Sequence, residues 1–328
     1  MNLMPPSPLY KFSSFEGGKA ILEYRCLWTK SPLDFNDPFE VLPAFDEDRK
    51  NESILSRRRF YQHIRVPGGG NLTAEGDDHK TPVEDFVDLA GIYHDPFFAS
   101  IYTRFRVLCF SEEVSPILLW SHYAASHSGI ALGFDLNKGN FPLGRISAGL
   151  PVDYISDRSA LLLPLDYYTF KGAQMIDPNP APIGHVKTSS GIIITQADQQ
   201  ARYLDCLKTM LRHKCQVWEY EKERRFLYDL SLSWEDGLKD TQPDSNGNTH
   251  KAAFFEPDAI TDIVFGYRCT PEQIHSLLPI IETLPSVRLH YVDFHPTDYE
   301  VRVFQGDFLQ IHATHSMRRQ RMTFRYTC

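Results

Sequence analysis

Three glutamates at alternate positions form the most unusual polar pattern of the sequence. Glu219, Glu221 and Glu223 lie in a segment for which we expect a strand that continues to Tyr228. Alternate residues of a strand face the same side, about 7 Å apart, so the three carboxylates would line one face. Neighbouring carboxylates repel one another unless a cation or the hydroxyl groups of a ligand lie between them. The pattern indicates a ligand site, and its alternative is a solvated edge strand whose glutamates pair with the two arginines that follow.

A hydroxyl and a carboxylate follow the short apolar segment 107–110, which we expect to be a buried strand. Ser111 and Glu112 end this strand, and a helix expected at 116–125 could direct its first backbone N–H groups at an anion. Capping of that helix by Ser111 explains the serine equally well. His122 has no third metal ligand within reach along the sequence, so we interpret it as a hydrogen-bonded polar residue.

An Asn-Asp-Pro sequence between two phenylalanines predicts a well-defined polar loop. Asn36 and Asp37 are typical of an Asx turn, and Pro38 makes such a turn rigid. Polar loops with a fixed shape often position ligands, so both side chains are candidate binding residues beside this structural interpretation.

Composition and missing motifs exclude several classes of protein. No apolar run approaches the roughly 18 residues of a membrane-spanning helix, and the first residues lack the basic and apolar parts of a signal peptide. The six cysteines form no Cys-x-x-Cys pair, which argues against a zinc site and predicts free thiols in a reducing cytoplasm. Phosphate-binding glycine loops and the Gly-x-Ser-x-Gly and His-Glu-x-x-His motifs are missing, which excludes kinases, Rossmann enzymes, α/β-hydrolases and zinc proteases.

Charge is unevenly distributed along the chain. The net charge of −8 argues against non-specific binding of nucleic acid by the body of the protein. The exception is the C-terminal end, where four arginines fall within 318–325 beside aromatic residues. Such an end could contact phosphate or an acidic partner, and the alternative is a frayed or docked terminus.

Expected strands and helices alternate irregularly, which predicts an α+β fold with a mixed or split β-sheet flanked by helices. We expect one domain over 1–314, with a charged, glycine-containing and mobile excursion near 46–78, and a basic tail at 315–328. A helix with a capping box at Thr270 should run to about Leu284. Four large aromatic residues should be buried in one shared core: Trp120, Phe134, Trp218 and Phe265.

Several segments, in the same order, resemble the bacterial family known as domain of unknown function 2971. The resemblance covers roughly residues 9–304 and implies no particular reaction. Its segments are 9–12, 35–40, 108–112, 119–123 with 129–134, 218–226 and 263–268.

A looser resemblance is to the ADP-ribosyltransferase superfamily, whose members share three motif-bearing strands. An early strand with Arg, His or Tyr, a middle strand with Ser or Tyr and a late strand with Glu-x-Glu are similar to Tyr10-Lys11, Phe110-Ser111 and Glu221-Lys-Glu223. Lys11 departs from the family's Arg or His, and the middle strand lacks Ser-Thr-Ser. The resemblance implies an ADP-ribosyltransferase-like cleft and an NAD-dependent transferase or NAD glycohydrolase, with NAD as substrate, in bacterial defence against phage or in toxin action.

The same resemblance implies a role for each candidate residue. Glu223 would stabilise the oxocarbenium-like state that forms as nicotinamide leaves the ribose, and Glu221 would act on the acceptor. Ser111 would fix the ribose. The remaining candidates would bind the nucleotide by stacking, by contacts to phosphate or by hydrogen bonds: Tyr10, Lys11, Asn36, Asp37, Trp120, His122, Tyr123 and Arg225.

Two other functional classes stay open. A non-catalytic nucleotide-binding sensor would use the same cleft, but it would not need an ionised Glu223 there. A metal-dependent nuclease would hold its ion with hard oxygen ligands, and sensitivity to a chelator would distinguish it. Its candidate ligands are Asp37, Glu112, Glu221 and Glu223.

Overall fold

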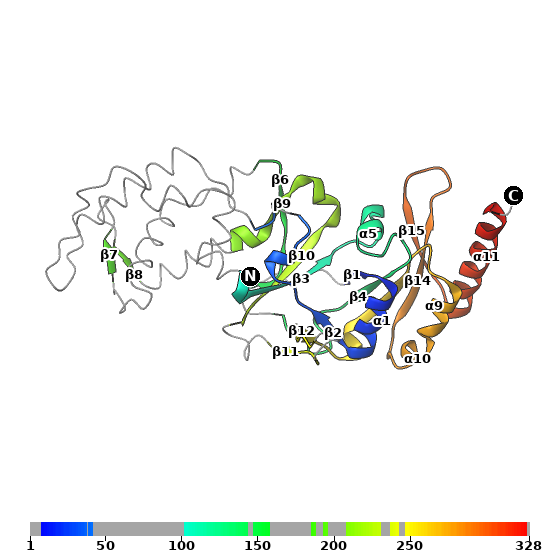
Figure 1. Cartoon of the computed structure of the whole chain (residues 1–328), viewed down its shortest axis with the longest axis horizontal. Helices are drawn as coiled ribbons and strands as arrows, with labels where there is room; N and C mark the ends of the chain where they lie inside the picture. The colour runs from blue at the N-terminus through cyan, green and yellow to red at the C-terminus, as the bar shows by residue number, and fades with distance from the viewer. Residues whose placement is uncertain are drawn as a thin grey trace. The chain divides into compact units, whose positions relative to one another are not determined.

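Residue contacts divide the chain into two compact units, where the sequence predicted one domain over 1–314 (Figure 1). Unit 1 comprises Met1–Ser31, Arg104–Val152 and Val217–Cys328, and unit 2 comprises Pro32–Thr103 and Asp153–Gln216. The structure is a computed structural model, and it describes residues 8–37, 39–41, 102–143, 147–157, 185–187, 193–195, 208–230, 237–242 and 247–326. The excursion predicted near 46–78 lies outside the described residues.

Unit 1 is built around an eight-stranded sheet. Its strands follow the order β15 (Val301–Gln305), β14 (Arg288–Phe294), β13 (Ile260–Phe265), β4 (Ile130–Phe134), β1 (Leu9–Ser13), β3 (Phe105–Ser111), β10 (Glu223–Asp229) and β5 (Ser147–Pro151). β13 and β14 are parallel and the other neighbouring pairs are antiparallel, so the sheet is mixed. With the helices around it, this sheet confirms the predicted α+β fold.

Four helices pack on one face of the sheet: α1 (Phe15–Tyr24), α9 (Pro271–Ser276), α10 (Leu278–Ile281) and α11 (Phe308–Tyr326). The predicted capping box is present, because Thr270 Oγ1 accepts the N–H of Gln273 at 3.2 Å and Gln273 Oε1 accepts the N–H of Thr270 at 2.8 Å. The helix divides at Leu277 into α9 and α10, since Pro279 has no backbone N–H to continue it.

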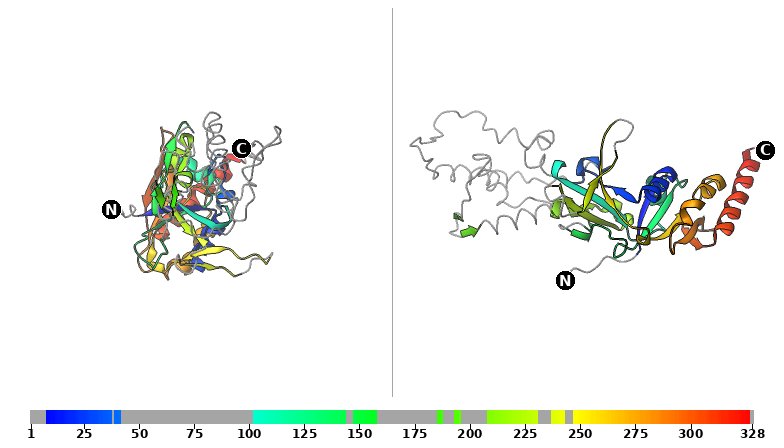
Figure 2. Two further views of the ribbon diagram at one scale, coloured as in Figure 1. Left: turned by 90° about the vertical axis from the view of Figure 1, so that its left-hand side faces the viewer. Right: turned by 90° about the horizontal axis from the view of Figure 1, so that it is seen from below.

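The C-terminal boundary predicted at residue 314 lies within a helix. α11 continues through it to Tyr326 and packs against α9, as Figure 2 shows for the red helix beside the orange ones. Residues 315–326, within the range of the expected basic tail, therefore belong to a helix of unit 1.

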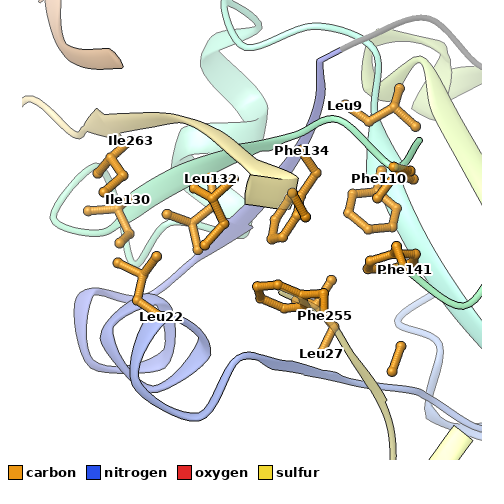
Figure 3. Packing of buried hydrophobic residues seen from close by; sticks show 14 of the residues in the cluster. Leu9, Leu22, Leu27, Phe110, Ile130, Leu132, Phe134, Phe141, Phe255 and Ile263 are labelled. Atoms are coloured by element: carbon orange, nitrogen blue, oxygen red, sulfur yellow. The ribbon is translucent and has the colours of Figure 1, made fainter. Parts of the chain in front are cut away.

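The main core lies between these helices and the sheet (Figure 3). In β4, Leu132 and Phe134 are fully buried and face this core, whereas Ala131 faces the opposite side. The ring of Phe134 meets those of Phe110 and Phe255 edge to face, at 5.7 and 5.2 Å between centroids, a geometry that adds to the energy of burial. A second sheet contributes to the same core with β11 (Leu238–Asp240), β12 (Lys251–Phe254) and β2 (Cys26–Trp28).

The opposite face of the eight-stranded sheet carries α5 (Ile117–His122) (Figure 1). Trp120 of this helix is fully buried, donates its indole N–H to the backbone oxygen of Val114 at 2.7 Å and packs edge to face on Phe12. Phe134 and Phe265 face the main core, whereas α5 lies on the other face of the sheet. Trp120 therefore belongs to a different cluster from these two residues. Trp218 is only partly buried, so the prediction of one core shared by four aromatic residues was wrong.

Unit 2 is described in short pieces. β6 (Asp153–Ile155) pairs in parallel with β9 (His213–Cys215), and β7 (His185–Lys187) pairs antiparallel with β8 (Ile193–Thr195). A 3-10 helix, η1, spans Pro32–Asp34. Lys214 and Glu40 form an ion pair at 3.5 Å with both side chains buried, so each charge compensates the other away from water.

Candidate functional site

One row of residues crosses six strands of unit 1 on the face that carries α5. Register partners in a sheet project from the same face, so these side chains form a continuous line, which we call the polar row. It runs from Glu223 to Ser111, Tyr10, Gly133, Asp262 and Arg288. The three strands that carry the predicted motifs are therefore neighbours, and Tyr10, Ser111 and Glu223 lie in line on one face.

Only the last of the three glutamates lies on a strand. Gln216–Glu221 form a 3-10 helix, η4, and β10 begins at Glu223. Lys222 joins the two and has a φ of 42°, in the left-handed region, so the helix ends there before the strand begins. The prediction of three carboxylates on one strand face was wrong, because Glu219 is exposed and pairs with Lys222 at 3.3 Å, whereas Glu221 and Glu223 are buried.

Glu221 is held at the end of η4 by α5 and β3. The hydroxyl of Tyr123 donates to Glu221 Oε1 at 2.7 Å, and the hydroxyl of Ser111 lies 2.7 Å from the backbone oxygen of Glu221. A carboxylate taken out of water needs such donors, because the loss of hydration is otherwise costly. Two predicted site residues, Tyr123 and Glu221, are thus in direct contact.

Glu223 is fixed by Arg225, which lies two residues along the same strand. Arg225 Nε reaches Glu223 Oε1 at 2.9 Å, and Nη2 reaches Oε2 at 3.1 Å. Both side chains are buried, and Arg225 is only 1% exposed, so its fork orients the carboxylate rather than a ligand. Burial raises the pKa of the neighbouring Cys109 thiol, and the Glu223 charge raises it further.

The Ser111 hydroxyl is used within the protein. It accepts the N–H of Glu113 at 3.1 Å, and it lies within donating distance of the backbone oxygens of Glu113 and Glu221, at 2.8 and 2.7 Å. Its single hydrogen serves one of these oxygens at a time. The expected capping of α5 by Ser111 was wrong, because Pro116 is the N-cap residue of that helix and the Ser111 hydroxyl bonds backbone groups of Glu113 and Glu221. The predicted contact of Ser111 with a ribose stays a prediction.

Lys11 projects from the opposite face to Tyr10, because consecutive residues of a strand alternate. Its ammonium donates to the backbone oxygen of Cys109 at 2.9 Å and lies 5.9 Å from the centre of the Phe110 ring. β1 and β3 share one register pair, so Lys11 bonds a carbonyl next to the point where the two strands part. Burial lowers the pKa of Lys11. The prediction that Lys11 faces the same space as Glu223 was wrong.

Four rings gather where α5 meets η4, and we call them the aromatic group. His122 is exposed, and its ring lies 6.1 Å from Trp218, 6.5 Å from Tyr220 and 6.3 Å from Tyr123. Trp120, by contrast, is enclosed in the protein and offers no face to a ligand. The rings of Trp218 and Tyr220 are partly exposed and that of His122 is exposed, and the sequence interpretation did not select the two aromatic residues of η4.

Within unit 1, the expected nuclease ligands Glu112, Glu221 and Glu223 do not form a metal-binding group among the described residues. Asp37 belongs to unit 2, and its Oδ1 accepts the N–H of Phe39 at 2.9 Å, as in the Asx turn predicted for Asn36-Asp37. Glu112 forms an ion pair with Arg224. Within the described stretches, the one group whose geometry could hold a metal is the partly buried His295 with the exposed Asp298 and Glu300, and it contains none of the predicted ligands.

The described arginines of the basic C-terminal end have partners in unit 1. Arg318 Nη2 lies 2.9 Å from Asp293 Oδ2, and its guanidinium lies 4.6 Å from the centre of the Tyr267 ring. Arg319 pairs with Glu272. These contacts dock α11, and the expected contact of residues 318–325 with phosphate stays a prediction.

A charged cluster on β13 and β14 was missed from the sequence. Asp262 is buried near the end of the polar row and accepts hydrogen bonds from Arg288 and His290 of the neighbouring strand. Two signals were available: an aspartate inside the apolar strand 260–265, and an arginine and a histidine at alternate positions of the next strand. Neither signal shows by itself that the two strands are neighbours.

No family model matches the sequence, and comparisons with curated proteins and with solved structures found no similar protein. The two resemblances stated from the sequence therefore stay predictions. Among the described helices, none is long and apolar enough to cross a membrane.

Proposed function

We propose that the chain binds NAD and cleaves the bond between nicotinamide and ribose, as a transferase or as a glycohydrolase. The observation that carries this proposal is the alignment of Tyr10, Ser111 and Glu223 on three adjacent strands. The resemblance to ADP-ribosyltransferases requires such neighbours, and the residues lie far apart in sequence. A binding module with the same residues would not need Glu223 oriented by a buried arginine.

The chemistry follows from the placement of the two buried glutamates. When the C1′–N bond breaks, its electron pair leaves with nicotinamide, and positive charge develops on the ribose. Glu223 supplies a fixed negative charge, because Arg225 holds both carboxylate oxygens before the ligand arrives. Water or another acceptor then bonds to C1′ and loses a proton, for which Glu221, hydrogen-bonded to Tyr123, is the base.

Ligand contacts come from groups that the protein leaves accessible. The aromatic group offers His122, Trp218 and Tyr220 for stacking on a planar base. Tyr10, which is half-buried, offers a phenol hydroxyl in the polar row. Lys11, Ser111 and Trp120 contact the protein itself, so we assign no ligand contact to them, and Ser111 enters the proposal only as the strand position between Tyr10 and Glu223.

The test is release of nicotinamide from NAD by the purified full-length chain, measured by chromatography. Glu223→Gln should lower the rate by a factor on the order of a hundred, the usual scale for loss of a preorganised electrostatic contact. Glu219→Gln is the matched control, because Glu219 is an exposed glutamate of the same segment. It should leave the rate unchanged.

Stability needs its own control, because Glu223→Gln leaves Arg225 buried without its charge partner, at a cost of about 3–5 kcal/mol. Glu223→Asp keeps the charge and withdraws the carboxylate by one methylene. It should retain the fold, seen by circular dichroism, and still lose most of the activity. Full activity in both Glu223 variants, or no nicotinamide release by the wild type, would refute the proposal. Binding of NAD without cleavage would support the nucleotide-binding module instead.

A further inference from the structure

Asp262 and Arg288 are the last two members of the polar row, and the hydrogen-bonding capacity of the Asp262 carboxylate is filled. Asp262 Oδ1 accepts Arg288 Nε at 2.9 Å and His290 Nε2 at 2.7 Å. Its Oδ2 accepts Arg288 Nη2 at 2.8 Å and Thr261 Oγ1 at 2.7 Å. Four donors occupy about four lone-pair sites, so Asp262 has no oxygen electron pair left for a cation.

The groups around Asp262 keep donors that nothing in the described part of the chain uses. Arg288 employs two of its five N–H groups on Asp262, and its side chain is 52% exposed, so three N–H groups remain available. His290 uses its Nε2–H on Asp262, so it helps to fill the hydrogen-bonding capacity of that carboxylate. The Tyr10 hydroxyl is a second unused donor, because it has no hydrogen-bond partner among the described residues.

Gly133 brings Tyr10 to this cluster. A Cβ at Gly133 would lie 2.9 Å from the Asp262 side chain and 3.2 Å from the Tyr10 ring, so both side chains close over the glycine. Burial raises the pKa of the Tyr10 hydroxyl, and the Asp262 charge raises it further, so the phenol keeps its proton as a donor. Tyr10 of β1 and Asp262 of β13, which holds Arg288, therefore lie on either side of Gly133 on this face of the sheet.

We propose that Arg288 and Tyr10 form an anion subsite that takes the diphosphate of a nucleotide, with Asp262, itself held by His290, as the residue that positions Arg288. Available N–H and O–H donors around a saturated carboxylate suit an anion, and a guanidinium fork matches phosphate oxygens. Tyr10 lies two strand spacings, about 10 Å, from Glu223 along the row. Arg288 lies five strand spacings, about 24 Å, from Glu223 by the backbone, and its side chain reaches one strand back to Asp262, so the dinucleotide lies extended along the row with its diphosphate beyond Tyr10. This assignment rests on the proposed function for the identity of the nucleotide, though not for the binding of diphosphate.

Calorimetric titration of the full-length chain with inorganic pyrophosphate and, separately, with ADP-ribose tests the subsite. Both should bind, ADP-ribose the more tightly. Tyr10→Phe removes one hydroxyl and leaves the ring and every ion pair in place, and it should weaken both ligands several-fold. Arg288→Lys keeps the charge but loses the fork, and it should weaken both about tenfold, the effect of losing charge-assisted hydrogen bonds.

Arg302→Gln is the matched control for charge. Arg302 is an exposed arginine of the same sheet, and it alternates with Val301 and Val303, which face α5, so it projects from the opposite face. It should leave both affinities unchanged. The inference is overturned if wild type binds neither ligand, if Arg302→Gln weakens binding as much as Arg288→Lys, or if Tyr10→Phe and Arg288→Lys both bind like wild type. Pyrophosphate has no glycosidic bond, so its binding tests the anion subsite whether or not the protein cleaves NAD.

Discussion

Replacement of Asp262 with asparagine should lower the free energy of unfolding by about 2 kcal/mol at pH 7. Burial by itself raises the pKa of this carboxyl, but hydrogen bonds from His290, Arg288 and Thr261 outweigh burial and lower the pKa from 3.8 to about 2. Each unit of pKa corresponds to about 1.36 kcal/mol, which gives the expected loss. Because the folded pKa lies below the unfolded one, the contribution is complete well above pH 4 and is lost as the pH falls towards 2.

Urea unfolding of the wild type and Asp262→Asn at a series of pH values measures this contribution. The difference between them should be constant from pH 7 to pH 5 and should fall to roughly half at pH 3, as linkage requires for these two pKa values. Asp258→Asn, an exposed aspartate of the 3-10 helix η6 (Pro257–Ala259), is the control and should change the free energy by less than about 0.5 kcal/mol. No difference at pH 7, or a difference that stays constant to pH 3, would show that the Asp262 contacts do not stabilise its ionised form.

Three further predictions concern the burial of two tryptophans, the turn at Lys222 and the reactivity of Cys269. Trp120→Ala should cost about 3–5 kcal/mol in chemical denaturation, and Trp218→Ala much less, because only the first ring is fully buried. Lys222→Gly should change the free energy of unfolding by less than about 1 kcal/mol. Lys222→Val should lower it by about 1–2 kcal/mol, because a β-branched residue resists the left-handed conformation. Equal effects of the two variants would contradict the role given to that turn. Cys269, whose pKa burial raises to about 12, should escape iodoacetamide at pH 8 in the native protein and react after urea is added, as peptide mass spectrometry can show.

Local patterns were enough to predict the elements that apolar residues and caps define. The strand before Ser111 is a short apolar run, and the helix after Thr270 begins with a capping box and a proline, each of which acts within a few residues. The α+β class followed from the irregular order of such elements. These predictions held because the interactions behind them lie close together in the sequence.

Predictions failed where one backbone angle or one face of a strand decided the outcome. Polar and apolar residues alternate before Glu223, as in a strand, yet Gln216–Glu221 form the 3-10 helix η4. The left-handed conformation of Lys222 separates η4 from β10. Lys11 was grouped with Tyr10 as one motif, although neighbours on a strand cannot face the same side. The Asp262 cluster depends on the parallel pairing of β13 with β14, which is a long-range contact that no local pattern encodes.

The two acids of the polar row differ in what their arginine partners leave accessible. Arg225 is 1% exposed and bonds both oxygens of Glu223, so that pair is closed and fixes a negative charge in place. Arg288 bonds both oxygens of Asp262 in the same manner, but its side chain is 52% exposed, and its other N–H groups are open to a ligand. The same ion-pair chemistry thus gives the row an oriented carboxylate at one end and anion-binding donors at the other. A ligand that carries developing positive charge beside phosphate groups is complementary to that order, and a ligand that lacks either feature would leave one end of the row unused.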